Sequence, residues 1–172
     1  MKRFIVALFL LLALPLSALA ADGAKFGSVD IQKVLLMSDA GKEAKDLLGQ
    51  KAGKYEAEKN SKEEELKKLK VELEKQGLLL SESARSSKER DYQQRLKEYQ
   101  RFLKDAQEDL QAKNDEFTSK IVDEIVKVAQ EYGRKNGYTA IFVKSETMVY
   151  LDPSADLTEE VLKAFNASRK RP

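Results

Sequence analysis

Apolar residues follow different patterns in three parts of the chain. Between residues 38 and 136 they recur at steps of three and four, among lysine, glutamate, glutamine and alanine, with no proline. This spacing predicts long amphipathic α-helices with an apolar stripe narrow enough for one partner helix. Residues 21–37 and 137–172 instead carry short apolar runs that predict a small body with β-strands. The expected fold class is therefore α+β and helix-dominated.

The segment 38–136 divides into two helices. The first has the apolar positions Ala44, Leu47, Leu48, Ala52, Tyr55, Leu66, Leu69, Leu73 and Leu80. The second has a more regular seam at Tyr92, Leu96, Tyr99, Leu103, Ala106, Leu110, Lys113, Phe117 and Ile121. Gly77 weakens the helix, and Ser81 can cap the next one. We therefore expect an antiparallel helical hairpin with its tip near residues 76–84.

This hairpin is too long to fit inside a compact domain. At 1.5 Å per residue its helices are roughly 60 and 80 Å long. A globule of this chain length is only about 40 Å across. The hairpin must therefore project as an arm, which begins with a cap at Ser38 and Asp39 and ends at Gly137.

The two ends of the mature chain are expected to meet at the root of the arm. Residues 25–30 predict a strand followed by a helical turn. Residues 138–143 and 147–151 predict a β-hairpin, closed by a loop at 144–146. Pro153 stops the second strand, and Thr158 is the expected N-cap of a final helix, with Leu157 and Leu162 as a hydrophobic staple.

The apolar faces of these strands exceed what one small helix can cover. The expected oligomer body consists of Phe26, Val29, Ile141, Val143, Val149 and Leu151. Self-association through this body is the simplest way to bury these residues. The alternative is that the base of the arm covers the sheet within a monomer.

Residues 1–20 have the pattern of a secretory signal peptide. Lys2 and Arg3 precede an apolar run up to Leu14, and Ala18 and Ala20 form a small-residue cleavage pattern. The run is shorter than the roughly 20 residues that span a bilayer, although an uncleaved anchor is the alternative reading. We expect cleavage after Ala20 and export to the periplasm.

Composition excludes several classes of function. The chain has no Cys and no His, which removes disulfides, cysteine nucleophiles, Ser-His-Asp triads and His/Cys zinc sites. Without residues 1–20 it has 29 basic and 29 acidic side chains, a balance that argues against a nucleic-acid partner. No nucleotide-binding loop and no pair of carboxylates in an apolar setting is evident. We therefore expect neither an enzyme nor a bound cofactor.

Four residues are candidates for contact with another polypeptide. Three adjacent leucines at the tip, Leu78, Leu79 and Leu80, are unusual at a solvated turn, although they could instead pack on one another. Phe102 lies off the apolar seam, whereas Tyr92 and Tyr99 lie on it and fit core packing better. Residues 56–65 contain only one apolar side chain, and they are either a flexing point or an ordinary solvated helix held by Glu/Lys pairs.

The order of motifs resembles one known family. A secretory signal is followed by Phe-Gly-Ser-Val-Asp-Ile-Gln-Lys-Val at 26–34, then Gly41-Lys42 and a long charged hairpin. The chain closes with Asn-Gly-Tyr at 136–138 and Asp-Leu-Thr-Glu-Glu-Val-Leu at 156–162. Over nearly all of the mature chain this resembles the Skp (OmpH-like) family of periplasmic chaperones.

The resemblance implies a homotrimer with a barrel-like body and three helical arms around a central cavity. It implies ATP-independent holding of unfolded outer-membrane proteins, with the outer-membrane assembly machinery as a further partner. Family members often have strongly basic arm tips, whereas the tip here mixes both signs of charge. We therefore expect hydrophobic rather than ionic holding. The competing hypothesis is a coiled-coil adaptor that bridges cell-envelope proteins.

Overall fold

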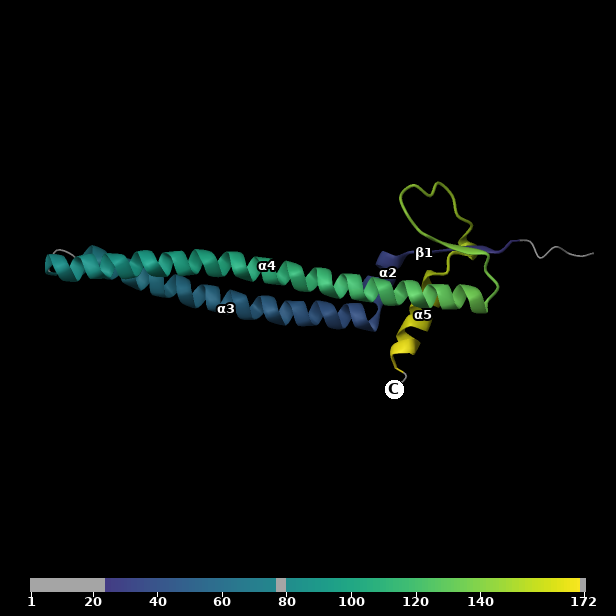
Figure 1. Cartoon of the computed structure of the whole chain (residues 1–172), viewed down its shortest axis with the longest axis horizontal. Helices are drawn as coiled ribbons and strands as arrows, with labels where there is room; N and C mark the ends of the chain where they lie inside the picture. Colours follow the sequence, from purple (N-terminus) through teal and green to yellow (C-terminus); the bar gives the residue numbers. More distant parts are fainter. Residues whose placement is uncertain (1–23, 77–79, 171–172) are drawn as a thin grey trace, which may run out of the picture.

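The computed structural model describes residues 24–76 and 80–170, in which a long two-helix arm extends from a small body (Figure 1). Helix α3 (Asp39–Gln76) and helix α4 (Glu82–Lys135) lie side by side and antiparallel along the arm. Both helices run where the heptad pattern predicts them. The expected signal peptide at residues 1–20 lies outside the described residues.

The ends of the arm helices are set by side chains that the sequence identifies. Ser38 Oγ accepts a hydrogen bond from the Gly41 N–H at 3.0 Å, which caps α3. Ser81 Oγ accepts from the Ala84 N–H at 3.3 Å and caps α4 in the same way. After α4, Gly137 has a φ of 68°, a left-handed conformation that glycine adopts without strain and that ends the helix.

The body contains a two-stranded parallel sheet. Strand β1 (Phe26–Val29) pairs with β2 (Ala140–Val143), with Phe26 opposite Ala140 and Val29 opposite Val143. Helix α2 (Ile31–Met37) follows β1, and the short 3-10 turn η2 (Pro153–Ala155) precedes helix α5 (Thr158–Arg169). The whole arm thus serves as the long crossover that a parallel strand pair requires.

The core of the body forms where the helices meet one face of the sheet. Its fully buried members include Val34 of α2, Ile125 of α4, and Val161 and Phe165 of α5. Helix α4 contributes residues to the arm along its first half and to this core along its second, through Ile121, Ile125 and Ala129. One continuous helix therefore joins the arm rigidly to the body.

The predicted pairing of the two C-terminal apolar runs is wrong. The predicted β-hairpin does not form, because only Ala140–Val143 is a strand and it pairs with β1 rather than with residues 147–151. That second run lies in a loop that arches away from the helices (Figure 1). The reason is that β2 packs Ile141 against α4 only when it lies beside β1, whereas residues 147–151 have no buried face within one chain to pack against.

The cap of the last helix also differs from the prediction. Thr158 is the first residue of α5, and the acceptor for its N–H is Asp156 Oδ1 at 3.0 Å. The Thr158 hydroxyl instead accepts from the Asp30 N–H at 3.0 Å and so joins α5 to the end of β1. The predicted staple residues Leu157 and Leu162 are both buried.

Candidate functional site

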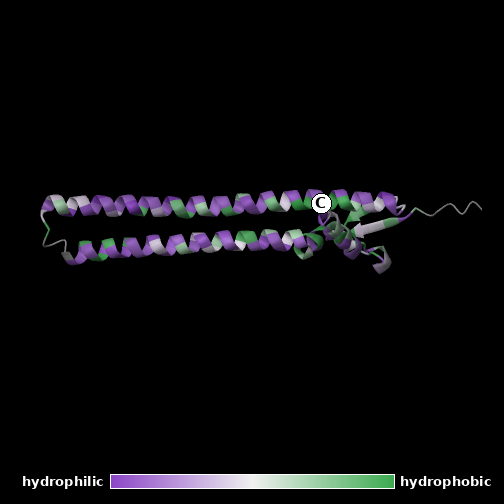
Figure 2. Ribbon diagram, turned by 90° about the horizontal axis from the view of Figure 1, so that it is seen from below, coloured by the Kyte–Doolittle hydropathy of each residue, from purple (hydrophilic) through white to green (hydrophobic). Residues whose placement is uncertain are grey.

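The arm has a thin apolar seam and two broad polar sides. Figure 2 shows hydrophilic residues along most of both helices, with apolar ones at intervals. Between residues 45 and 115 of the described chain, only Leu66 and Ala106 are buried, whereas seam residues such as Tyr92, Leu96 and Tyr99 are half-buried. The arm therefore exposes far more surface than it buries.

Three ion pairs join the two helices on one side of the seam, at intervals of one or two heptads. Lys51 Nζ lies 2.5 Å from Asp109 Oδ2, Arg95 Nη1 lies 3.0 Å from Glu65 Oε2, and Lys88 Nζ lies 2.5 Å from Glu72 Oε2. Each step of seven residues along α3 is matched by a step of seven back along α4. All six side chains are part-exposed, so each pair adds little stability, but together they fix the register of the helices.

We call this row of ion pairs the ion-pair ladder, and it is interrupted once, at Phe102. By register Phe102 lies opposite Glu58, which pairs instead with Lys62 at 3.4 Å. The Lys62 ammonium lies 5.3 Å from the centre of the Phe102 ring, and Tyr55 packs edge-on against that ring with centroids 6.0 Å apart. A cation and an aromatic edge are favourable partners for a ring. Phe102 therefore takes the place of a charged residue in the ladder, and Glu58 still has an ion-pair partner in Lys62.

The tyrosines of the seam add hydrogen bonds between the helices. The Tyr55 hydroxyl donates to Asp109 Oδ2 at 2.9 Å, and the Tyr99 hydroxyl donates to Glu63. The hydrogen bonds from Lys51 and Tyr55 hold the pKa of the Asp109 carboxyl below its usual value. The bond to Glu63 raises the pKa of Tyr99. The segment 56–65, poor in apolar residues, is thus joined to α4 by polar contacts.

A shallow groove of about 440 Å³ lies at mid-arm. Ala52 on α3 and Ala106 on α4 are both small, which leaves a hollow beside Leu103 and Leu110. Leu103 is 38% exposed, although the sequence places it in the seam. This groove is a hollow in the arm that the sequence analysis did not identify.

The four predicted contact residues have different positions. Leu78 and Leu79 lie outside the described residues, and Leu80 is half-buried in the bend before α4. Phe102 is half-buried against Tyr55, so part of its ring already has a partner. The structure therefore brings Phe102 to the groove but does not place it beside Leu80.

The body displays a second apolar surface. Phe26 and Phe142 pack on each other on the sheet face away from α4, with ring centroids 6.2 Å apart, and each is 53% exposed. Val143 is 58% exposed, and Val149 in the loop is fully exposed. The sequence analysis missed Phe142 and also Tyr150, which follows Val149 in the loop and is 78% exposed. Successive side chains of a strand point to opposite faces, so Phe142 lies on the same face as Ala140 and opposite to Ile141. This alternation could have identified Phe142.

The predicted oligomer body therefore divides into three groups. Phe26, Val143 and Val149 are exposed, and Ile141 and Leu151 are half-buried. Val29 is only 2% exposed and packs in the chain's own core, so it adds nothing to the exposed apolar surface of one chain. The reason is that Val29 points to the same side of the sheet as Ile125 and Val161, which cover it.

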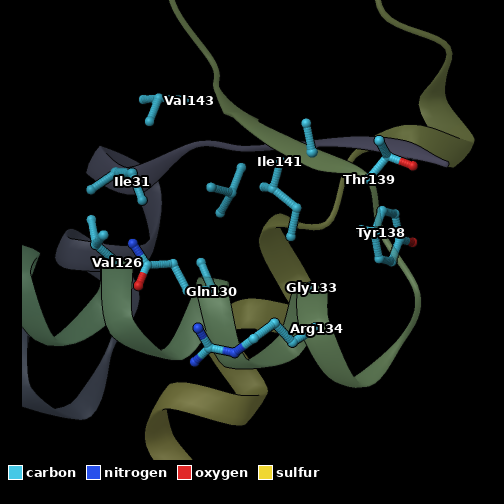
Figure 3. Close-up of a pocket in the computed structure, with 12 residues that line it drawn as sticks. Ile31, Val126, Gln130, Gly133, Arg134, Tyr138, Thr139, Ile141 and Val143 are labelled. Carbon is cyan, nitrogen blue, oxygen red and sulfur yellow. The ribbon is translucent and has the colours of Figure 1, made fainter. Parts of the chain in front are cut away.

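A pocket of about 310 Å³ lies between β2 and α4 (Figure 3). Ile141 points from β2 toward Gly133, whose missing side chain makes room, since an added Cβ would lie 3.0 Å from Ile141 Cδ1. Ile31, Val126 and Val143 complete an apolar rim. Arg134 and Gln130 also line the pocket, but no arrangement of a nucleophile and a base accompanies them.

Nothing in the described part of the chain forms a metal site or a membrane span. No group of three or more His, Cys, Asp or Glu side chains converges there. No described helix is long and apolar enough to cross a membrane. The lowered pKa values of the carboxyls arise mainly from hydrogen bonds and ion pairs, as at Asp109 and Glu116.

Comparison with known proteins agrees with this architecture. The family model for outer membrane protein (OmpH-like) matches residues 25–165. The chain belongs to the OmpH-like family. A protein of Aquifex aeolicus (strain VF5), described as uncharacterized, is 30% identical over 166 residues, which cover 96% of this chain and 97% of that protein.

A solved OmpH-like structure has the same fold. It comes from Caulobacter crescentus CB15, is provisionally described as an outer membrane chaperone (OmpH-like), and superposes with a TM-score of 0.79. Identity is 16%, and the match covers 84% of this chain and 85% of that one. Because so little sequence is shared, what the two OmpH-like chains have in common is the helix-dominated fold with its long arm.

The match to the OmpH-like family covers both parts of the molecule. The matched range extends from the start of β1 into α5 and includes the whole arm. Body and arm together are therefore the unit that the OmpH-like chains share.

Proposed function

We propose that this protein is an ATP-independent periplasmic holding chaperone. It binds unfolded outer-membrane β-barrel proteins between helical arms and prevents their aggregation. The observation that carries the proposal is the arm itself, which presents two long helices with little buried core. Such a surface offers many weak contacts to a flexible chain, as a holding chaperone requires.

The arms are held together by a body of three subunits. Support comes from the exposed Phe26 and Phe142, which pack on each other, and from the exposed Val143 and Val149. The free edge of β2 and the unpaired run 147–151 are further support, because an exposed strand edge with a β-prone segment nearby favours pairing with another copy. A trimer would place three arms around one cavity.

Client contact is assigned to the apolar residues that the arm needs least for its own packing. Leu78, Leu79 and Leu80 near the tip and the exposed part of Phe102 are our candidates. The outer-membrane assembly machinery is the proposed recipient of the client. Residues 1–20 direct export and are then removed by cleavage after Ala20.

Light scattering tests the proposal directly. The mature protein should have the mass of three chains, and with urea-denatured β-barrel protein it should form a soluble complex on dilution. ATP should change neither result. Binding to one folded envelope protein, without any effect on the unfolded one, would instead establish an adaptor and contradict the proposal.

A further inference from the structure

The two edges of α4 beside the apolar seam differ in charge. In a heptad repeat the e and g positions flank the seam, and they often carry Glu or Lys that pair with the partner helix. The g positions of α4 are Lys88, Arg95, Phe102 and Asp109. The e positions, also seven residues apart, are Gln93, Gln100, Gln107 and Asn114. In a chain with 35% charged residues, one edge of the arm thus carries four uncharged amides in succession.

The g edge is fully engaged within the arm, whereas the amide edge is free. Three of the four g residues form the ion-pair ladder with α3, and Phe102 contacts Tyr55 and Lys62. All four e-position amides are exposed. Within the residues that the structure describes, none of them forms a side-chain hydrogen bond. By contrast, Gln94 on the outer face donates to Glu98, and Gln111, which lines the mid-arm groove, donates to Asp115.

The facing edge of α3 adds little free charge. Its e positions are Gly49, Glu56, Glu63 and Lys70, and the Lys70 ammonium lies 3.9 Å from Glu74 Oε1. Glu56 Oε1 accepts from Lys59 Nζ at 2.9 Å, and Glu63 accepts from the Tyr99 hydroxyl. The two carboxylates on this side are therefore already satisfied inside the arm.

The mid-arm groove opens on this same edge. Its lining includes Gln107 together with Leu103, Ala106 and Leu110 of α4 and Ala52 of α3. Apolar side chains thus lie directly beside amides that have both donors and an acceptor to offer.

We propose that the amide edge and its groove bind an extended segment of unfolded polypeptide. The inference rests on the proposed holding function and names the surface that performs it. An extended chain presents one N–H and one C=O per residue, which glutamine side chains can match in any sequence. Its alternate side chains can enter the groove, because successive side chains of an extended chain point to opposite sides. A phosphate or lipid headgroup would instead need cations, and the e positions of α4 supply none.

A matched pair of single variants separates the two kinds of amide. Gln100→Ala removes one amide, with its donors and its acceptor, from the edge, and Gln94→Ala removes one from the outer face of the same helix. The probe is a fluorescently labelled, urea-denatured β-barrel protein, diluted into each chaperone and followed by anisotropy. The edge variant should bind about tenfold more weakly, the effect of losing two neutral hydrogen bonds, and the outer-face variant should bind like the wild type.

A photo-crosslinking residue gives an independent readout. Placed at position 100 it should capture the probe, and placed at position 94 it should not. Equal affinity of the Gln100→Ala and Gln94→Ala variants, or equal crosslinking at the two positions, would overturn the amide edge while leaving the holding function intact. If the wild type itself fails to bind the probe, the holding function fails, and the amide edge fails with it. Crosslinks at position 100 between chaperone chains only would show that a second copy occupies this edge and would also overturn the proposal.

Discussion

Lys51 on α3 and Asp109 on α4 meet at 2.5 Å, and Tyr55, one turn further along α3, donates to the same carboxylate. Asp109 is thus held by two donors from the partner helix. The same register places Arg95 beside Glu65 and Lys88 beside Glu72. Charge therefore helps to align residues 51–72 of α3 with residues 88–109 of α4, where the apolar seam is thin.

The ion-pair ladder should tolerate a swap of the two charges within a pair, but not the reversal of one charge alone. Glu65→Lys places two cations together and should lower the free energy of unfolding by about 0.5 kcal/mol, since both side chains are half exposed. Adding Arg95→Glu should recover most of this loss. Urea unfolding followed by the helical circular dichroism signal measures both effects. If the double variant is no more stable than the single one, the two side chains do not interact.

Acid should weaken the contact at Asp109. The donors hold the pKa of this carboxyl below its ordinary value near 4, so its contribution is present above that value and is lost as the pH falls through the lower pKa of the folded state. Asp109→Asn should therefore reduce stability at pH 7 and make unfolding less dependent on pH below about 4. Thermal unfolding at pH 7 and pH 3 compares the two proteins. An unchanged difference between the two pH values would exclude Asp109 as a source of acid sensitivity.

Two glycines of α3 should respond in opposite ways to alanine. A Cβ at Gly41 would lie only 1.7 Å from the Leu35 carbonyl oxygen, so Gly41→Ala should cost about 2 kcal/mol or more by forcing α2 and α3 apart. Gly53 has open space around it, so Gly53→Ala should stabilise the helix by up to about 1 kcal/mol. Thermal melts of the two variants provide the measurement. Equal melting temperatures would show that the α2–α3 junction is not close-packed.

The loop residue Val149 should be essential for the trimer. It is fully exposed in one chain, and Val149→Asp would bury a carboxylate once another subunit covers it, which costs several kcal/mol. We expect loss of the trimer by light scattering with most helical signal retained. Ala57→Asp, on the exposed outer face of α3, is the control and should leave the mass unchanged. A trimer that survives Val149→Asp would exclude Val149 from the interface.

Client holding should depend little on salt. The mature chain has equal numbers of positive and negative side chains, and screening limits attraction to about 8 Å at physiological ionic strength. Replacing Leu78, Leu79 and Phe102 by Ser should weaken suppression of β-barrel aggregation while the trimer stays intact. Light scattering at two salt concentrations tests both statements. Holding that collapses with salt, with the triple variant as active as wild type, would establish an ionic mechanism instead.

Much of the arm could be read from the sequence because its contacts are periodic. The seam through Leu96 and Leu110, the caps at Ser38 and Ser81, and the end at Gly137 all rest on neighbours within a few residues. The candidate surfaces were harder to predict. Phe102 lies at a g position, and its contact with Tyr55 depends on the alignment of two helices distant in sequence.

The sequence alone determined the helical hairpin, since heptad spacing and local caps specify both helices and the short connection between them makes them antiparallel. Only the tertiary structure decided the body. Strand propensity at 147–151 favoured a hairpin with β2, but the pairing of β2 with β1 allows Ile141 and Val29 to pack on the helices. Which strand pairs with which depends on the apolar surface that each pairing buries, and that surface belongs to α4 and α5. A short apolar run cannot specify its partner, because the faces that cover it come from residues far away in the chain.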